Sequence, residues 1–147
     1  MIKICFVCLG NICRSPMAEF ILKDKIKKNN LENIYYVESR ATSYEEEGND
    51  MHIGAKEILR INNIPFTKHQ ARRLEISDYN MFDYFICMDD SNVRNAINIF
   101  KKDQLNKVIK LNKDNVKDPW YTGNFNETFD DLNIGINRIL EGELNEK

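Results

Sequence analysis

A cysteine and an arginine are spaced for chemistry near the start of the chain, in the Cys-x5-Arg-Ser pattern of residues 8–15. The thiolate of a cysteine is a strong nucleophile, and helix N-termini and nearby cations favour it over the thiol. An arginine guanidinium can bind two phosphoryl oxygens at once. The pattern therefore predicts a site where Arg14 holds a phosphoryl group, or a related oxyanion, and Cys8 attacks it.

The elements around this pattern predict how it is positioned. The apolar run of residues 2–7 is typical of a buried strand, and Ser15 followed by Pro16 predicts the N-cap and first residue of a helix. The positive end of the helix dipole would then point into the loop. Gly10 and Asn11 readily adopt left-handed backbone conformations, which turn consecutive N–H groups inward around an anion.

The rest of the chain alternates β-rich apolar runs with helical periodicity. Strands are expected at residues 2–7, 34–38, 84–88 and 108–111. Amphipathic helices are expected around the stripes Ala18, Ile21, Leu22, Ile26; Met51, Ala55, Ile58, Leu59; Val93, Ala96, Ile97, Phe100; and Phe129, Leu132, Ile136, Ile139, Leu140. We predict one α/β domain over residues 1–147: a three-layer sandwich with a four-stranded parallel sheet flanked by helices, in flavodoxin-like doubly wound topology.

Composition narrows the class of protein. The 147 residues are 42% hydrophobic and 30% charged, with a formal net charge of -2, which predicts no nucleic-acid partner. No apolar run reaches the roughly 20 residues of a membrane-spanning helix, and the N-terminus does not resemble a signal peptide. The expected location is cytoplasmic. The four cysteines are too few and too poorly spaced for a disulfide scaffold or a zinc site.

The segment Val7-Cys8-Leu9-Gly10-Asn11-Ile12-Cys13-Arg14-Ser15-Pro16 resembles the phosphate-binding loop of low-molecular-weight protein tyrosine phosphatases. The resemblance extends to Asp118-Pro119-Trp120-Tyr121, and to segments around Ser39, His69 and Phe82-Asp83-Tyr84. It implies hydrolysis of phosphotyrosine in proteins, without metal or cofactor, and inhibition by phosphate or vanadate. The expected oligomeric state is a monomer or a weak dimer.

The resemblance also implies residue roles. Cys8 would be the nucleophile, Arg14 would bind the phosphoryl group, and Asp118 would act as general acid and then as general base. Pro119 is expected to hold Asp118 in extended geometry, although Asp-Pro by itself often only opens a turn. The substrate would be bound by the loop residues Leu9, Gly10, Asn11, Ile12, Cys13 and Ser15.

Further residues are expected to support or enclose this site. By the resemblance, Asn11, Ser15, Ser39 and His69 would hold the loop in shape, with Ser15 also donating its hydroxyl to the Cys8 sulfur. A slot walled by Trp120, Tyr121, Ile12 and Tyr44 would favour an aryl phosphate over the shorter phosphoserine. The acidic run of residues 45–47 would line the approach or lie on the solvated surface.

Cys13 leaves two interpretations open. It lies close enough to Cys8 for a reversible disulfide that would protect the nucleophile, or it is a small buried filler. Cys5 and Cys87 lie within strand runs and are expected in the core.

Four other functions fit these residues less well than tyrosine phosphatase activity. A thioredoxin-coupled arsenate reductase needs relay cysteines, and none follows Cys87. Protein-arginine phosphatases carry Thr where this chain has Ile12. A non-catalytic phosphotyrosine-binding module, or a redox sensor, would have no use for the proton donor Asp118.

Overall fold

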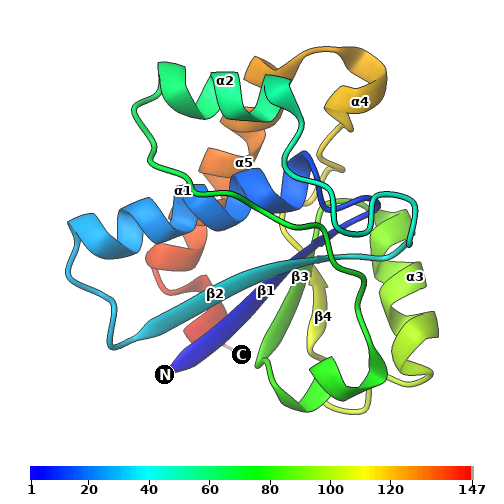
Figure 1. The fold of residues 1–147 in the computed structure, drawn as a ribbon. Coiled ribbons are helices and arrows are strands. Elements are labelled where there is room, and N and C mark those ends of the chain that lie inside the picture. The colour runs from blue at the N-terminus through cyan, green and yellow to red at the C-terminus, as the bar shows by residue number, and fades with distance from the viewer. Residues whose placement is uncertain (147) are drawn as a thin grey trace.

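The computed structural model of the protein describes residues 1–146, and its centre is a four-stranded parallel sheet. The strands are β1 (Ile2–Cys8), β2 (Tyr35–Ala41), β3 (Tyr84–Cys87) and β4 (Val108–Lys110), in the spatial order β2-β1-β3-β4 (Figure 1). The order reverses between β1 and β3, which is the position where doubly wound sheets bind ligands beyond the carboxyl ends of their strands. The predicted flavodoxin-like topology is confirmed.

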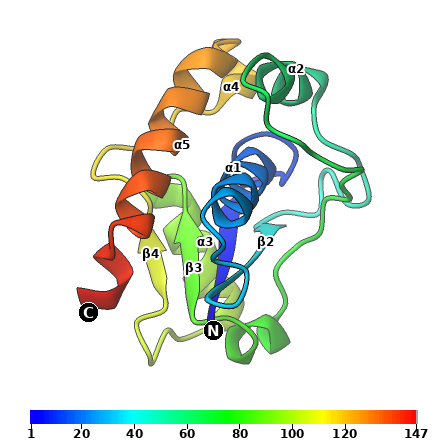
Figure 2. The same ribbon diagram turned by 90° about the vertical axis from the view of Figure 1, so that its left-hand side faces the viewer.

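Helices cover both faces of the sheet (Figure 2). One face carries α1 (Arg14–Lys28) and α5 (Phe125–Leu140), with α2 (Ile53–Ile61) packed against both helices. The other face carries α3 (Asp90–Phe100) and the 3₁₀ helix η1 (Ile76–Asn80). The short helix α4 (Pro119–Thr122) precedes α5, and a second 3₁₀ helix, η2 (Glu143–Glu146), follows it.

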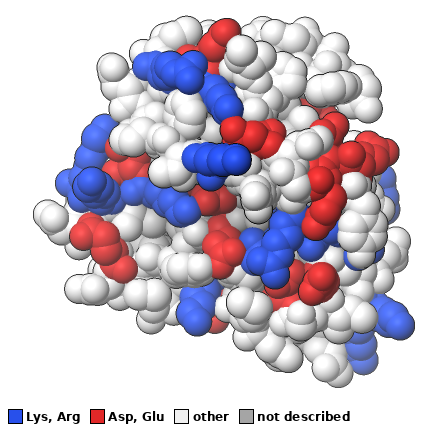
Figure 3. All heavy atoms as spheres, viewed as in Figure 1, with Lys and Arg blue, Asp and Glu red and all other residues white. Residues whose placement is uncertain are grey.

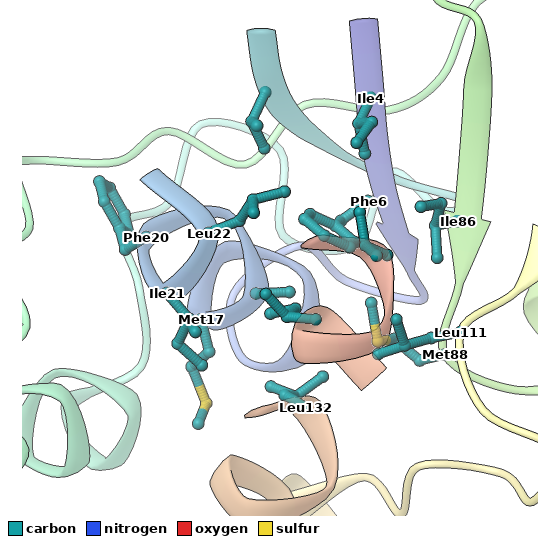
Figure 4. Close-up of a cluster of buried hydrophobic side chains, with 14 of the residues drawn as sticks. Ile4, Phe6, Met17, Phe20, Ile21, Leu22, Ile86, Met88, Leu111 and Leu132 are labelled. Atoms are coloured by element: carbon teal, nitrogen blue, oxygen red, sulfur yellow. The ribbon is translucent and has the colours of Figure 1, made fainter. Parts of the chain in front are cut away.

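Each face of the sheet has its own apolar core. Between the sheet and α1 and α5, Ile4 and Phe6 of β1 pack with Met17, Ile21 and other buried side chains (Figure 4). The core on the α3 face is smaller and contains Cys5 and Val7 of β1. From Ile4 to Cys8, alternate residues of β1 therefore point into the two cores, which explains why the strand is apolar apart from the exposed Lys3.

Several strand boundaries differ from the sequence-based expectation. β1 continues one residue further, to Cys8, and β2 begins one residue later, at Tyr35. β2 was expected to end at Glu38, but it continues to Ala41, because it pairs with β1 along its whole length, from Ile2↔Tyr35 to Cys8↔Ala41. The extension places Ser39 inside the strand, buried beside the loop that follows β1. β3 and β4 each end one residue earlier than expected.

The surface carries charges of both signs. On the face viewed in Figure 3, basic and acidic side chains are interspersed, as the balanced composition of the chain suggests. Within residues 1–146, no helix is long and apolar enough to cross a membrane.

Candidate active site

The Cys8 sulfur lies at the carboxyl end of β1, at the bottom of a pocket of about 120 Å³. The backbone N–H groups of Asn11 and Ser15 donate to its Sγ atom at 3.3 and 3.4 Å. The Ser15 Oγ atom lies 2.9 Å from the same sulfur. Since Asn11 Nδ2 donates to Ser15 Oγ at 2.8 Å, the Ser15 hydroxyl hydrogen is free to point at the sulfur. Three donors can thus face one thiolate.

Two local predictions about this loop are wrong. Helix α1 begins at Arg14 with Cys13 in the N-cap position, and Ser15 does not cap it because the Ser15 hydroxyl contacts Cys8 and Asn11. Gly10 does not have the positive φ that was expected, whereas Asn11 does, at 60°. An added Cβ at Gly10 would lie 3.4 Å from Glu46 Cγ, which is a van der Waals contact, so no close approach requires the glycine either.

Asn11 is the centre of a buried polar network. Its side-chain amide donates to Ser39 Oγ at 2.9 Å as well as to Ser15, and its Oδ1 accepts the backbone N–H of Arg72 at 3.1 Å. His69 Nε2 donates to the Asn11 carbonyl at 2.7 Å. These bonds satisfy the polar groups of a buried residue in a left-handed conformation. The contacts expected among Asn11, Ser15, Ser39 and His69 are present.

The Arg14 side chain is buried and held on one side by two acceptors. Its Nη1 donates to Asp89 Oδ2 at 2.7 Å and to the Val116 carbonyl at 2.9 Å. Burial by itself would lower the pKa of Arg14, but Cys8, Asp89 and Asp118 hold it above its ordinary value. The guanidinium is therefore a permanent positive charge next to the Cys8 sulfur.

Asp118 lies across the pocket from the Cys8 loop, as the N-cap residue of α4. Its backbone is extended (φ -79°, ψ 114°), as expected for a residue before Pro119. Oδ1 accepts the Trp120 N–H at 3.0 Å, and Oδ2 lies 3.5 Å from Arg14 Nη2. The structure therefore brings the Asp118 carboxyl next to the thiol and the guanidinium, from which it is more than a hundred residues away along the chain.

Aromatic and acidic side chains form the upper walls of the pocket. Trp120 and Tyr121 line it together with Ile12, and both aromatic residues are exposed. Of the acidic run, Glu45 and Glu46 also line the pocket, whereas the exposed Glu47 does not and instead accepts the Arg73 N–H at 3.0 Å. Tyr44, expected as a wall, is not among the lining residues; its ring lies under the Arg73 guanidinium, 4.5 Å from ring centroid to Cζ.

The remaining cysteines differ from Cys8 in their surroundings. Cys13 lines the pocket but is buried. Its burial, and to a smaller extent the nearby Cys8, raises the pKa of its thiol well above the usual range. Burial likewise raises the pKa of Cys5 and Cys87, which lie in the core. All four cysteines are free thiols.

Sequence reasoning assigned no role to three residues that contact the site, although Met88-Asp89 is part of the resemblance to the phosphatase family. Asp89 binds Arg14, Glu19 accepts the Ser39 hydroxyl at 2.6 Å, and His52 caps α2 while its ring contacts Trp120. No short motif identifies Glu19 or His52, whereas Asp89 follows β3 at the carboxyl edge of the sheet, where site residues are expected. Among the described residues, no group of three or more His, Cys, Asp or Glu side chains could hold a metal ion.

A doubly wound parallel sheet whose first strand leads into a Cys-x5-Arg loop facing an Asp-Pro segment is the arrangement expected of the small protein tyrosine phosphatases. The chain belongs to the low molecular weight phosphotyrosine protein phosphatase family, whose model matches residues 3–147.

Individual relatives agree with this assignment. The low molecular weight protein-tyrosine-phosphatase PtpA of Staphylococcus aureus (strain MRSA252) is 42% identical over 146 residues, covering 96% of this chain and 93% of PtpA. The crystal structure of SP-PTP, a low molecular weight protein tyrosine phosphatase from Streptococcus pyogenes, superposes with a TM-score of 0.91 at 40% identity, covering 97% and 93% of the two chains. YfkJ from Bacillus subtilis gives a TM-score of 0.93 at 36% identity, covering 100% and 97%.

Proposed function

We propose that this phosphatase hydrolyses phosphotyrosine in proteins, and small aryl phosphates, through a covalent intermediate on Cys8. The observation that carries the proposal is the position of the Cys8 sulfur, which faces two backbone N–H groups and the Ser15 hydroxyl within 3.4 Å. The Arg14 guanidinium lies in the wall of the same pocket. Such an environment stabilises a thiolate and accommodates a phosphoryl group.

In the first step the Cys8 thiolate attacks the phosphorus atom, an S–P bond forms, and the P–O bond to the tyrosine oxygen breaks. Arg14 binds the phosphoryl oxygens and balances the charge that spreads over them in the transition state. The protonated carboxyl of Asp118 gives its proton to the departing oxygen, so that a neutral phenol leaves.

In the second step a water molecule attacks the phosphorus of the cysteinyl phosphate. The Asp118 carboxylate takes a proton from this water, the S–P bond breaks, and inorganic phosphate leaves. The electron pair of that bond returns to Cys8, where the Ser15 hydroxyl and the two N–H groups stabilise the thiolate. Both steps use the same carboxyl, and neither needs a metal ion.

The shape of the pocket supports an aryl substrate. The sulfur is buried, so a phosphoryl group must extend inward past Trp120 and Tyr121 to reach it. The tyrosine side chain is long enough to span this depth and offers a ring to the aromatic walls, whereas phosphoserine is shorter and has none. Ile12, buried in the loop beside the pocket, adds an apolar surface that suits a ring.

A substrate panel with one variant tests the proposal. Initial rates are measured on phosphotyrosine, phosphoserine and phosphoarginine peptides, and on arsenate with a thiol reductant, all in buffer that contains a chelator. We expect phosphotyrosine to be preferred, vanadate to inhibit, and Cys8→Ser to lose at least about 10⁴-fold in kcat. Normal turnover by Cys8→Ser would overturn the covalent mechanism, and a preference for phosphoarginine or arsenate would overturn the substrate assignment.

The proposal extends to the setting of the enzyme. We place it in the cytoplasm as a monomer or weak dimer that acts on phosphotyrosine proteins. Cell fractionation and analytical ultracentrifugation would test these two points.

A further inference from the structure

His52 has contacts that link the nucleophile loop to the segment that carries Asp118. It lies just before α2, and its backbone N–H donates to the Ile12 carbonyl at 2.9 Å. Its ring packs edge-on against Trp120, with centroids 5.6 Å apart, and stacks on Phe125 at 5.2 Å. The views in Figures 1 and 2 agree that α2 lies beside α4 and the start of α5.

The two aromatic partners of His52 bracket the Asp118 segment. Trp120 follows the carboxyl by two residues, and its N–H is the group that binds Asp118 Oδ1 at 3.0 Å. Phe125 is the first residue of α5, at the far end of the same segment. The His52 ring therefore contacts the Asp118 segment near both of its ends, while the His52 backbone N–H is hydrogen-bonded to the Cys8 loop.

The orientation of this ring is itself determined. Nδ1 of His52 accepts the Gly54 N–H at 2.9 Å, which fixes the ring at the N-terminus of α2. Gly54 has no Cβ, and an added one would lie 2.5 Å from the Phe125 ring. The close approach of Phe125 to α2, and so its stacking on His52, depends on this glycine.

We propose that His52 is a positioning residue for the general acid: its ring holds Trp120, and through the Trp120 N–H it keeps the Asp118 carboxyl aimed at the leaving oxygen. The inference rests on the proposed function, because it assumes that Asp118 protonates the leaving group. His52 does not touch substrate in this role. A loss of the ring would leave Cys8 and Arg14 in place and misalign only the proton donor.

Two variants separate the ring from the helix cap. His52→Asn keeps a side-chain acceptor for the Gly54 N–H, since asparagine is a good N-cap, but removes the ring. His52→Phe keeps a ring of similar size and removes the acceptor. Ile53→Ala is the matched control, because Ile53 is the neighbouring residue in the first turn of α2 and is exposed.

The experiment compares kcat/KM on two aryl phosphates with different leaving groups. Phenyl phosphate releases a poor leaving group that needs a proton, whereas 2,4-dinitrophenyl phosphate releases a phenolate that leaves without one. We expect His52→Asn to lose about ten- to a hundredfold on phenyl phosphate and to stay close to wild type on the dinitrophenyl ester. His52→Phe should recover most of the phenyl phosphate activity despite a lower thermal midpoint, and Ile53→Ala should resemble wild type.

The same two substrates, measured with Asp118→Ala, distinguish a failure of the acid assignment of Asp118 from a failure of the positioning role of His52. If Asp118→Ala shows no dependence on the leaving group, the acid assignment is wrong and the inference about His52 is overturned with it. If Asp118→Ala shows that dependence but His52→Asn slows both substrates equally, or neither, only the inference about His52 is overturned.

Discussion

The nucleophile loop, residues 8–15, and the acid segment, residues 118–125, face each other across one pocket but are held in different ways. The loop is held by buried hydrogen bonds. Its residues Asn11 and Ser15 are 0% exposed, and they bond to each other, to the Cys8 sulfur and to Ser39. In the acid segment Trp120 and Tyr121 are 57% and 77% exposed, and ring packing on His52 supplies much of the anchoring.

This difference suits the two tasks. A cysteine thiolate must be stabilised before substrate arrives, which requires donors fixed in advance. Under the proposed function, the acid segment must admit a phosphotyrosine side chain past its aromatic residues, and exposed segments with few buried contacts open at low cost. We therefore expect changes in the loop to reduce stability and rate together, and changes in the acid segment to reduce rate with little loss of stability.

The largest effect that bears on this comparison is expected at Asp118. Asp118→Ala removes the proposed proton donor and should lower kcat on phosphotyrosine by about 10² to 10⁴-fold, the usual share of a general acid. The thermal midpoint should change little, because the segment is partly exposed. Steady-state kinetics and thermal unfolding of the same preparation measure both quantities.

Asp118→Asn is the matched control for this variant. An asparagine can still accept the Trp120 N–H, so the cap of α4 is kept while the ability to donate a proton as an acid is lost. It should be as slow as Asp118→Ala. A rate near wild type in Asp118→Asn would assign to Asp118 a purely structural role.

Asn11 should show the opposite behaviour, with a smaller effect on rate and a larger one on stability. Asn11→Ala removes the three side-chain bonds to Ser15, Ser39 and Arg72, and should lower the free energy of unfolding by about 3 kcal/mol. We expect kcat to fall about tenfold as the loop loses its shape. Denaturant unfolding and steady-state kinetics test the two effects.

Asn11→Gly separates the lost bonds from backbone strain. Both variants lack the amide, but only alanine is strained at a φ of 60°, so Asn11→Ala should be about 1 kcal/mol less stable than Asn11→Gly. Wild-type stability in Asn11→Gly would mean that the polar network does not hold the loop, and the contrast between the two regions would disappear.

The smallest effect is expected from a pair of tyrosines at the pocket mouth. Tyr121 lines the pocket and Tyr44 does not. Tyr121→Ala should therefore raise KM for small aryl phosphates by about two- to tenfold, the value of one aromatic contact, while Tyr44→Ala should leave it unchanged. Initial-rate curves for both variants make the comparison. An equal rise in both would place Tyr44 in the wall after all.

Much of the fold and the loop could be predicted because the signals are local. Apolar runs and helical stripes indicated the four strands and the doubly wound topology, and the Cys-x5-Arg spacing identified one edge of the sheet. Local rules failed where a side chain had a partner from elsewhere. Ser15 was predicted as a helix cap, but its hydroxyl is engaged by Cys8 and Asn11. The predicted end of β2, residue 38, was three residues too early, because the length of β2 is determined by its pairing with β1.

The sequence by itself determined which reactive groups the chain carries. It also determined that Cys8 and Arg14 lie at the two ends of one loop, because the strand, the turn and the start of the helix follow one another within the first 15 residues. Only the tertiary structure decided that Asp89 binds Arg14 and that His52 contacts the Asp118 segment. It also decided that Tyr44 does not line the pocket. Those contacts join residues tens of positions apart, and their geometry follows from how the helices pack on the sheet, which no spacing along the chain encodes.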